Sequence, residues 1–538
     1  MAGASRKGRK GGGSVGESIN FRLRGLGGRE SIKYRLRSMG NDGTGRLKSA
    51  LPFTDTCGNE FGGGNKFGDS EKRYYICSCE TTVSELTVSE VLEKQIFRIM
   101  KFFGREKEIK FLQDIEADSH KCAQLTVLTG RRRIGKTSLV LKAYEDLRIV
   151  YFFVSRKAEK DLCQGFISEL ESKLGIPMLG NANSFADVFE YVMKLSASTP
   201  ITIFIDEFQD FKYVNTSIFS DMQRIWDLHK EGSKINLIVA GSVNTLMNEL
   251  FRDNKQPLYQ RETGYLKLSG FSPNVLKEIL STYNPEYTNE DLLALYSFTG
   301  GVAKYVELMV DHNIFTCQAM VEYMIRDGST FLDEGKVMLI AEFGKEYGMY
   351  FSILSAIASG RTRRTEIEDK LGKDIGGYLT RLENDYELIS KRQPIFEKTD
   401  NKNVCYQLRD NFLSFWFRFI YKYSFMLEIK AYRKLREIIM RDYETFSGFM
   451  LERYFREILM EKEEYTRIGG WWDRKGLNEI DIVAADDIEH RLDFIEVKRN
   501  ADKYRNGLLE DKILAFLRVN KDLSDWDRSL RCLSLKDL

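Results

Sequence analysis

An excess of charge of one sign is missing from this 538-residue chain. Lysine and arginine number 81 and aspartate and glutamate 79, so the formal net charge is only +2. No basic field covers the whole protein, and any contact with nucleic acid has to come from a local patch. At this length the chain can form three or four domains, each with its own core.

Cysteine and histidine are few and scattered. The chain has eight cysteines and four histidines, and only Cys77 and Cys79 are closely spaced. A single C-x-C pair is a poor zinc signature, and the histidines have no metal-ligand spacing. The simplest interpretation is free thiols in a reducing cytosol, which predicts a cytoplasmic protein.

Long apolar runs are also missing. The basic N-terminus lacks the apolar core of a secretory signal. The most apolar stretch, 412–427, is interrupted by Arg418 and Lys422 and is too short to span a bilayer. We interpret it as one buried, aromatic-rich helix and expect no membrane association.

Residues 1–99 differ from the rest of the chain. They contain 17 of the 42 glycines and show no sustained periodicity before about Thr82, although a short amphipathic helix over 83–100 fits the pattern. Strongly patterned sequence begins at Met100. We interpret 1–99 as a disordered or artefactual extension, and the hypothesis is that Met100 is the true start.

From Arg105 onward, short apolar strands alternate with helices. Strands are expected at 124–128, 149–154, 201–205, 235–240 and 264–268, and helices at 106–115, 136–147, 160–174 and 185–195. This rhythm predicts an α/β fold over 100–272, with a parallel sheet covered by helices on both faces. Helices without strands then predict a helical lid over 273–345.

A glycine-rich loop follows the first of these strands. Its glycines let successive backbone N–H groups surround phosphates, assisted by the N-terminus of the next helix. Lys136 is expected to reach the β- and γ-phosphates of ATP, and Thr137 to bind Mg²⁺. The loop matches G-x-x-x-x-G-K-S/T and predicts a P-loop with the sequence Gly130-Arg131-Arg132-Arg133-Ile134-Gly135-Lys136-Thr137, followed by Ser138.

Two acids, Asp206 and Glu207, end the third strand. In P-loop enzymes the first such acid supports the Mg²⁺ shell and the second orients or deprotonates the attacking water. The second acid favours an ATPase over a GTPase switch. Alone the pair would also fit an ordinary strand cap, but beside a P-loop we interpret it as catalytic.

Three further residues are candidates for contact with the nucleotide. Ser242 follows the fourth strand, where a polar residue near the γ-phosphate is expected. Arg261 is either an arginine finger on the nucleotide of the same or a neighbouring subunit, or a solvated, ion-paired arginine. Lys304 is either a cation supplied by the lid or a surface lysine.

The rhythm changes again over 346–410. Helices expected at 350–358, 364–371 and 375–386 precede strands at 388–391 and 404–408. Three helices and a two-stranded wing predict a winged helix-turn-helix, which binds duplex DNA or, as an equally open alternative, acts as a protein–protein spacer. The DNA reading rests on its basic residues, Arg361, Arg363, Arg364, Lys370, Lys373 and Arg381.

Several segments carry a resemblance to one family: Phe103-Gly-Arg-Glu106, Gly130 to Thr137, Phe204-Ile-Asp-Glu-Phe-Gln209, Gly241-Ser242, Leu258-Tyr-Gln-Arg261, Gly300-Gly-Val-Ala-Lys-Tyr305, Tyr406-Gln-Leu-Arg-Asp410 and Phe415-Trp-Phe-Arg-Phe419. Together they resemble the archaeal-type (DEXX-box) ATPase family of AAA-related, STAND-like P-loop ATPases. The resemblance covers about 100–538 and implies an ATP-binding core followed by an uncharacterised C-terminal domain. One departure is Ala303, where relatives usually carry proline.

Residues 411–538 open with long helices and then show adjacent strands at 480–484 and 492–497. Asp481 on one strand, with Glu496 and Lys498 on the next, resembles the core of a PD-(D/E)XK nuclease. Asp481 and Glu496 are expected to share a divalent metal, with Lys498 orienting the attacking water and Glu452 as the helix acid. Glu479 is expected to face away from Asp481. The open alternative is a retained fold used for binding or signalling.

These observations predict a Mg²⁺-dependent ATPase whose nucleotide cycle controls a winged helix and a nuclease-like C-terminal domain. Two alternatives remain open: a non-hydrolysing, ATP-dependent signalling switch, and an ATP-gated, metal-dependent DNA nuclease. The expected partners are ATP and duplex DNA, and a homo-oligomer is compatible with the sequence.

Overall fold

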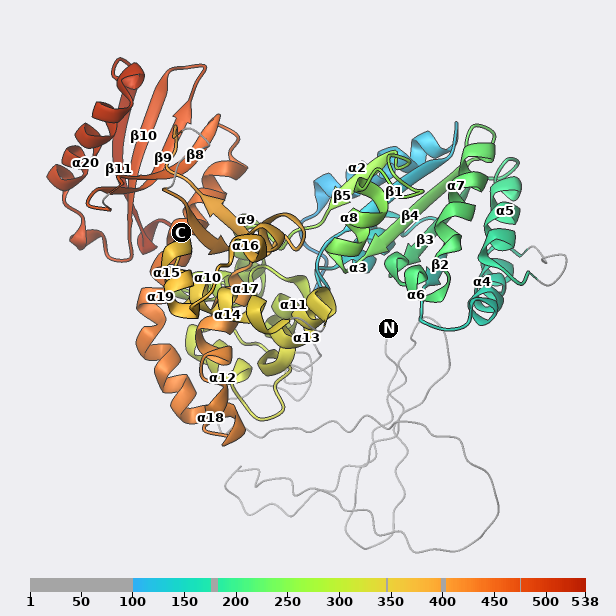
Figure 1. Cartoon of the computed structure of the whole chain (residues 1–538), viewed down its shortest axis with the longest axis horizontal. Coiled ribbons are helices and arrows are strands. Elements are labelled where there is room, and N and C mark those ends of the chain that lie inside the picture. Colours follow the sequence, from blue (N-terminus) through green and yellow to red (C-terminus); the bar gives the residue numbers. More distant parts are fainter. Residues whose placement is uncertain (1–99, 176–181, 345–346, 398–402, 475) are drawn as a thin grey trace, which may run out of the picture. The chain divides into compact units, whose positions relative to one another are not determined.

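A computed structural model describes residues 100–538, apart from 176–181, 345–346, 398–402 and 475 (Figure 1). These residues all belong to one structural unit, Ile96–Leu538. The expectations for 1–99, including a helix over 83–100, fall outside the described residues.

Five parallel strands form the first sheet, in the order β2-β3-β4-β1-β5. β3 and β4 are buried along their whole length, as expected of strands covered on both faces. β1 pairs with β4 and with β5, so the loops after these three strands meet at one edge. All five predicted strands are confirmed: β1 (Gln124–Thr129), β2 (Ile149–Phe153), β3 (Ile201–Asp206), β4 (Ile235–Gly241) and β5 (Gly264–Lys267).

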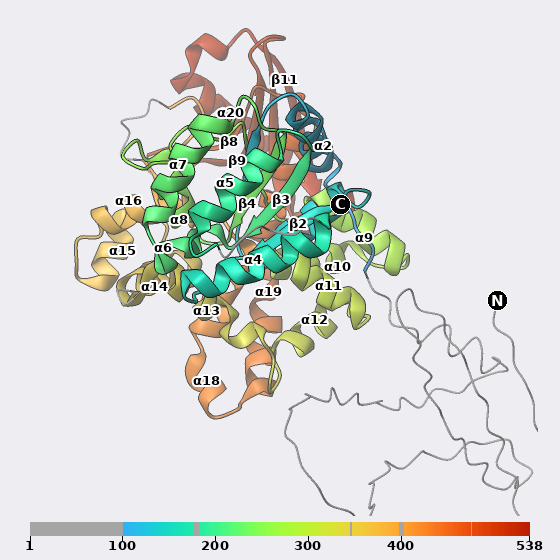
Figure 2. The same cartoon turned by 90° about the vertical axis from the view of Figure 1, so that its right-hand side faces the viewer.

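Helices cover both faces of this sheet. Val127 and Ile205 face the core shared with α4, α5 and α7, and Figure 2 shows these helices in front of the strands. Leu128 and Phe204 face the other core, shared with α2 and α3. The four predicted helices are α2 (Glu106–Ser119), α3 (Lys136–Ala143), α4 (Glu159–Leu174) and α5 (Phe185–Leu195), of which α3 ends earlier than expected. The structure adds α6 (Phe211–Val214), α7 (Ser217–His229) and α8 (Asn244–Arg252).

Five helices follow β5, in the region where the sequence predicts a helical lid. Tyr305 packs against Phe412 with ring centroids 4.7 Å apart, and Phe298 packs equally closely against Phe415. These helices therefore share a core with the segment after residue 410. They are α9 (Pro273–Tyr283), α10 (Asn289–Thr299), α11 (Ala303–Asp311), α12 (Cys317–Met324) and α13 (Phe331–Phe343).

The helices and strands expected over 346–410 are present. The two strands pair antiparallel, with Ile389 opposite Leu408. Buried Tyr350 on the first helix packs against Tyr378 on the third, with ring centroids 5.3 Å apart, and so holds the two helices together. The elements are α14 (Tyr347–Ala358), α15 (Arg364–Leu371), α16 (Gly376–Asn384), β6 (Ile389–Arg392) and β7 (Cys405–Leu408).

The aromatic stretch 412–427 is not the single helix that the sequence predicts. α17 (Asn411–Phe415) passes into a π-helical segment over Trp416–Tyr421, and α18 (Ser424–Glu428) follows. Successive bulky rings are buried here, including Phe415, Trp416 and Phe417. A π-helical turn is wider than an α-helical one and directs neighbouring side chains differently, which lets these rings all face the core. A long helix, α19 (Tyr432–Glu461), comes next.

The last part of the chain forms a four-stranded sheet in the order β11-β10-β9-β8. β10 pairs antiparallel with β9, as the adjacent strands in the sequence suggest, and parallel with β11. Phe516 of α20 packs on Phe494, so α20 covers one face of the sheet. The elements are β8 (Arg467–Trp472), β9 (Glu479–Asp486), β10 (Arg491–Lys498), α20 (Asn506–Val519) and β11 (Asp527–Ser534).

Candidate functional site

The loop between β1 and α3 has the backbone that a glycine-rich motif requires. Gly130 and Gly135 have φ angles of 148° and 98°, which L side chains rarely adopt. A Cβ atom at Gly130 would also lie 2.6 Å from the carbonyl oxygen of Leu268. Gly135 directly precedes α3, so the positive N-terminus of that helix faces the loop and favours a bound anion.

Lys136 is buried at the first position of α3. Its Nζ donates hydrogen bonds to the carbonyl oxygens of Gly130 at 2.7 Å and Arg131 at 3.2 Å. Burial lowers the pKa of Lys136 to about 8, although Glu207 and Asp206 favour its charged form. A buried ammonium group held by carbonyl oxygens is well placed to exchange them for a phosphate.

Thr137 and Asp206 meet at the carboxyl edge of the sheet. The Thr137 hydroxyl donates to Asp206 Oδ2 at 2.7 Å, and the Tyr151 hydroxyl donates to the same oxygen at 3.3 Å. A hydroxyl and a carboxylate in this arrangement are the protein ligands that Mg²⁺ has in P-loop sites. The two residues that the sequence assigns to Mg²⁺ are therefore adjacent.

Glu207 is held by two donors. The Ser242 hydroxyl donates to Glu207 Oε2 at 2.7 Å, and the Gln209 side-chain amide donates to the same oxygen at 2.6 Å. Sequence reasoning gave Gln209 no role, although it lies two residues after Glu207. Glu207 also has a left-handed backbone, with φ of 53°, an uncommon conformation that is enriched at functional sites.

A cavity of about 340 Å³ lies over the P-loop. Arg132, Ser138 and Glu207 contribute to its lining, as does Lys304 at the start of α11. The backbone N–H of Lys304 donates to the carbonyl oxygen of Arg133 at 3.2 Å, and its Nζ pairs with Glu307 at 2.9 Å. The structure thus places Lys304 beside the P-loop rather than on a remote surface.

Arg261 lies at the opposite edge of the sheet. Thr263 donates its N–H to the carbonyl oxygen of Leu125, at the amino end of β1, whereas the P-loop follows the carboxyl end. A six-residue strand such as β1 is about 20 Å long. The Arg261 guanidinium forms an ion pair with Asp227 at 3.0 Å. The expectation that Arg261 reaches the nucleotide of its own subunit is therefore wrong, and only the neighbouring-subunit version stays a prediction.

Two P-loop arginines contact residues far along the chain. Arg131 pairs with Asp410 and donates to the Tyr305 hydroxyl at 2.9 Å. Arg133 pairs with Glu334 at 2.7 Å, and the Tyr305 hydroxyl donates to Glu334 at 2.8 Å. Burial lowers the pKa of Arg131, but Asp410 and the other nearby groups outweigh this effect and raise it. Both guanidinium groups are therefore committed to carboxylates outside the nucleotide-binding core.

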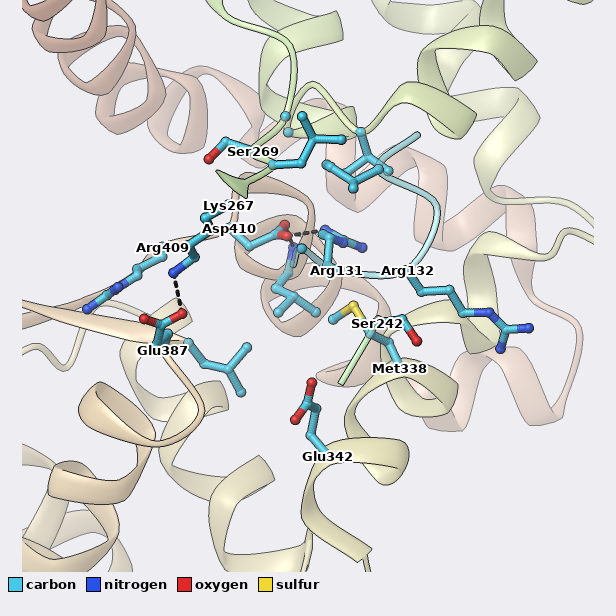
Figure 3. Close-up of a pocket in the computed structure, with 18 of the residues that line it drawn as sticks. Arg131, Arg132, Ser242, Lys267, Ser269, Met338, Glu342, Glu387, Arg409 and Asp410 are labelled. Carbon is cyan, nitrogen blue, oxygen red and sulfur yellow. Dashed lines mark hydrogen bonds and ion pairs between the residues drawn. The ribbon is translucent and has the colours of Figure 1, made fainter. Parts of the chain in front are cut away.

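A second cavity, of about 820 Å³, adjoins the P-loop on the side of Ser242. Figure 3 shows Arg131 and Asp410 pointing toward each other in this cavity, while Arg132 points away from them. Lys267 at the end of β5 forms an ion pair with Glu387 along the same wall. The cavity therefore lies where the end of the sheet, α13 and the segment before α17 come together.

The acids predicted in the last sheet also come together. Asp481 on β9 and Glu496 on β10 both pair with Lys498, at 3.3 and 2.8 Å. The sequence does not indicate that Lys512 on α20 donates to both carboxylate oxygens of Glu496, at 2.8 and 3.1 Å. An ammonium group thus lies where a cation shared with Glu496 would bind.

Glu452 on α19 completes this cluster. Burial, followed by the charge of Asp481, raises the pKa of Glu452 to about 7. Arg456 bridges the two residues, since its Nη2 pairs with Glu452 at 3.3 Å and donates to the carbonyl oxygen of Asp481 at 2.8 Å. The expectation that Glu479 faces away from Asp481 is wrong: residues two apart on a strand share a face, and Glu479 lines the same cavity as Glu452.

The described residues contain neither a clustered set of metal ligands nor a membrane-spanning helix. Among them, no group of three or more histidine, cysteine, aspartate or glutamate side chains is arranged to hold a metal ion. No helix in that part of the chain is both long and apolar enough to cross a membrane.

Comparisons with known proteins place these features in a family. Residues 102–309 match an ATPase domain predominantly from Archaea, and 416–508 match a domain of archaeal and bacterial proteins of unknown function. An uncharacterized protein of Methanocaldococcus jannaschii is 31% identical over 414 residues, which cover 74% of this chain and 87% of that protein.

Two solved structures show weaker similarity. The Walker-type ATPase of Pyrococcus abyssi is 18% identical, with a TM-score of 0.46 over 60% of this chain and 97% of its own. Cdc6p of Pyrobaculum aerophilum is 16% identical, with a TM-score of 0.30 over 64% and 97% of the two chains. The sequence relationship, together with the parallel sheet and its P-loop, shows that this chain belongs to the archaeal P-loop ATPase family.

Proposed function

We propose that this chain binds ATP with Mg²⁺ and hydrolyses it. The supporting observation is the row of Thr137, Asp206, Glu207 and Ser242 along one edge of the sheet, with hydrogen bonds of 2.7 Å at each end. Thr137 and Asp206 would hold the metal, which neutralises phosphate charge when bound. Glu207 orients the attacking water, and Lys136 stabilises charge on the β- and γ-phosphates.

Phosphate release by three variants tests this proposal. Lys136→Ala is expected to lose ATP binding, whereas Glu207→Gln is expected to keep binding and lose turnover by at least about 100-fold. Lys142→Ala is the control, because Lys142 lies on the same helix but pairs with Glu145 at the surface. Turnover near background in the wild-type chain would favour the non-hydrolysing switch instead.

The contacts of the P-loop arginines support a coupled mechanism. Arg131 connects the P-loop to Asp410, whose Oδ1 also accepts the N–H of Leu413 and caps α17. A change in the loop on ATP binding or hydrolysis would act directly on the start of the C-terminal region. On this proposal the chain comprises a core over 100–272, a lid over 273–345, a winged helix over 346–410 and a C-terminal domain over 411–538.

The variant Asp410→Asn separates capping from coupling, because asparagine caps helices as well as aspartate does but carries no charge. We expect wild-type hydrogen exchange over 411–461 to differ between ATP and ADP, and Asp410→Asn to abolish that difference. Glu387→Gln is the control, since it breaks the Lys267 pair in the same cavity without touching the P-loop. An unchanged ATP–ADP difference in Asp410→Asn would argue against coupling through Asp410.

The arrangement of α14, α15, α16 and the β6–β7 hairpin supports a winged helix that binds duplex DNA. Arg364 pairs with Glu368 and Arg381 with Asp385, whereas Arg361 and Lys373 form no ion pair within the described residues. The test is retention of duplex DNA as a function of salt concentration. No retention at low salt would leave the protein–protein role.

The last sheet supports a nuclease-like reading of the C-terminal domain. A helix, three antiparallel strands, a second helix and a parallel fourth strand place Asp481, Glu496 and Lys498 on one face, beside Glu452. We propose that a divalent ion binds here and that the domain cuts DNA under control of the ATPase. Supercoiled plasmid with Mn²⁺, with and without ATP, tests it. If the double variant Glu496→Ala with Lys498→Ala still cleaves the plasmid, these two residues take no part in the cleavage.

A further inference from the structure

Five arginines line a cavity of about 410 Å³. This cavity is separate from the nucleotide site, and neither Asp481 nor Glu496 lines it. The cavity lies between the α14–α15 turn, the β6–β7 hairpin, α19 and the start of β9. Of the described residues, two carboxylates line it, Glu452 and Glu479, and no lysine or aspartate does. The arginines are Arg363, Arg392, Arg418, Arg453 and Arg456.

The guanidinium groups are poorly neutralised within the described residues. Arg363 and Arg392 form no ion pair there, and Arg418 donates only to the carbonyl oxygen of Ala358. Arg453 donates to backbone carbonyls and to the Asn411 side chain. Of the five, Arg456 pairs with a carboxylate, Glu452, and its Nε is buried with no hydrogen-bond partner among the residues that the structure describes.

This excess of positive charge affects the residues around the cavity. Burial, then the charge of Arg392, lowers the pKa of Arg456 to about 10. Among the described residues the lining has two carboxylates against five guanidinium groups, so positive charge remains in excess there. Like charges gathered in a partly buried site are costly unless an anion joins them.

The walls of the cavity indicate which anion fits. The Arg392 guanidinium stacks on Trp472, 5.6 Å from the ring centroid, and Phe446 and Phe449 form another wall. Phe449 is 60% exposed, so its ring is accessible to a ligand in the cavity. Guanidinium forks bind phosphate oxygens in pairs, and exposed aromatic rings stack on bases.

We propose that this arginine cavity binds a nucleotide phosphate, with the adjoining base against its aromatic wall. The position favours a phosphate within a nucleic-acid strand, since the lining includes Glu452 of the acid cluster and Arg363, which directly precedes α15 of the winged-helix segment. The proposal extends the DNA-handling function above, but it concerns binding alone and does not require cleavage.

Binding of a fluorescein-labelled 12-nucleotide oligothymidylate to the full chain tests the proposal. EDTA prevents cleavage, and the binding mixture contains no free nucleotide, since a free nucleotide competes for any phosphate site. The variant Arg392→Ala with Arg418→Ala removes two charges that line the cavity, make no ion pair within the described residues, and do not belong to the basic residues assigned to duplex binding. The matched control, Arg433→Ala with Lys434→Ala, removes two exposed charges from α19, where both pair with Glu437.

We expect the cavity variant to bind the oligothymidylate at least ten-fold more weakly than wild type. The slope of log affinity against log salt concentration should also fall by about 1.4, because each lost phosphate contact on a single strand accounts for about 0.7. The control should match wild type in both. Equal binding and slope in the two variants would overturn the proposal. Thermal melts check that both variants are folded. If the double variant unfolds, Arg392→Lys takes its place. This substitution keeps the charge but removes the guanidinium that stacks on Trp472 and binds two phosphate oxygens, so we expect weaker binding.

Two further measurements complete the test. One distinguishes a free nucleotide from a nucleic-acid strand, and the other distinguishes the cavity from the winged helix. Competition by thymidine monophosphate would assign the cavity to free nucleotides, whereas competition only by oligonucleotides would assign it to a strand. Duplex retention, measured on the same variants, reports on the winged helix. Loss of oligothymidylate binding with duplex retention intact would support the cavity alone, and unaltered oligothymidylate binding would reject it whatever the duplex result.

Discussion

The Ser242 hydroxyl donates a 2.7 Å hydrogen bond to Glu207 Oε2, the same oxygen that accepts the Gln209 amide at 2.6 Å. Two donors on one oxygen fix the direction of the Glu207 carboxylate. Ser242 lies at the end of β4 and Glu207 at the end of β3, and neighbouring parallel strands bring the two together. Ser242 is thus a positioning residue for Glu207, which we propose orients the attacking water.

Ser242→Ala should lower kcat for ATP about ten-fold and leave KM nearly unchanged. One hydrogen bond to a charged group is lost, while Gln209 still holds the carboxylate. Steady-state phosphate release measures both constants. Ser242→Thr keeps the hydroxyl and should restore kcat. A raised KM with normal kcat would instead show that Ser242 contacts the nucleotide.

Nucleotide affinity should fall as pH rises above about 8. Burial lowers the pKa of Lys136 to about 8 in the nucleotide-free protein, so its charged form dominates below that pH and is lost above it. Because phosphate binds the charged form, affinity for ADP should be constant at pH 6.5–7.5 and decrease up to ten-fold per unit above about 8.

Fluorescence titration with a labelled ADP, in EDTA so that Mg²⁺ takes no part, measures this dependence. Lys136→Arg is the control, because a guanidinium stays charged throughout the range. Its affinity should be lower but independent of pH. A flat profile in the wild-type chain would mean that the Lys136 ammonium keeps its ordinary pKa.

The nucleotide site could be predicted because its parts are local. A strand, a turn and a helix within residues 124–143 place the P-loop, and Asp206–Glu207 follow a strand of the same sheet. The location of Arg261 could have been predicted from the order of the elements in the same way. It precedes β5, so it must lie at the amino edge, away from loops that follow strands.

Contacts between distant segments could not be predicted in this way. Arg131 and Asp410 are 279 residues apart, and nothing in either local sequence indicates the other. Lys512 likewise reads as one more charged residue on an amphipathic helix until α20 is placed over β10. The edge strand β11 escapes notice because four of its eight residues are exposed and no apolar run marks it.

Gly301→Ala should lower the free energy of unfolding by more than about 2 kcal/mol. Gly301 has φ of 68°, and an added Cβ would lie 2.3 Å from the carbonyl oxygen of Phe271. That backbone cannot yield easily, because Phe271 N donates to the Gly301 carbonyl at 2.7 Å. Thermal melts measure the change.

Gly448→Ala is the matched control for that prediction. Gly448 lies inside α19, and a Cβ there would meet nothing within 4 Å. Alanine is the better helix former, so this variant should be stabilised by about 0.5–1 kcal/mol. Similar melting temperatures for the two variants would contradict the close approach at Gly301.

Lys512→Met should tighten binding of Mn²⁺ by at least about ten-fold. The Lys512 ammonium contacts both oxygens of Glu496, so an ion shared by Glu496 and Asp481 has to displace it or accept its repulsion. Methionine keeps much of the length and apolar character of the lysine stem and removes the competing charge. Calorimetric titration without nucleotide measures the affinity.

Two further variants decide whether the effect arises at the acid cluster. Lys503→Met removes an exposed lysine that pairs with Glu444 at 3.8 Å, and should leave Mn²⁺ binding unchanged. Glu496→Ala combined with Lys512→Met should lose the gain, because the carboxylate that Lys512 blocks is gone. If Lys512→Met instead weakens Mn²⁺ binding, Lys512 helps to position Glu496 rather than competing with the metal. The Lys512 ammonium would then be a permanent partner of Glu496, as expected of a domain that binds ligands without cutting DNA.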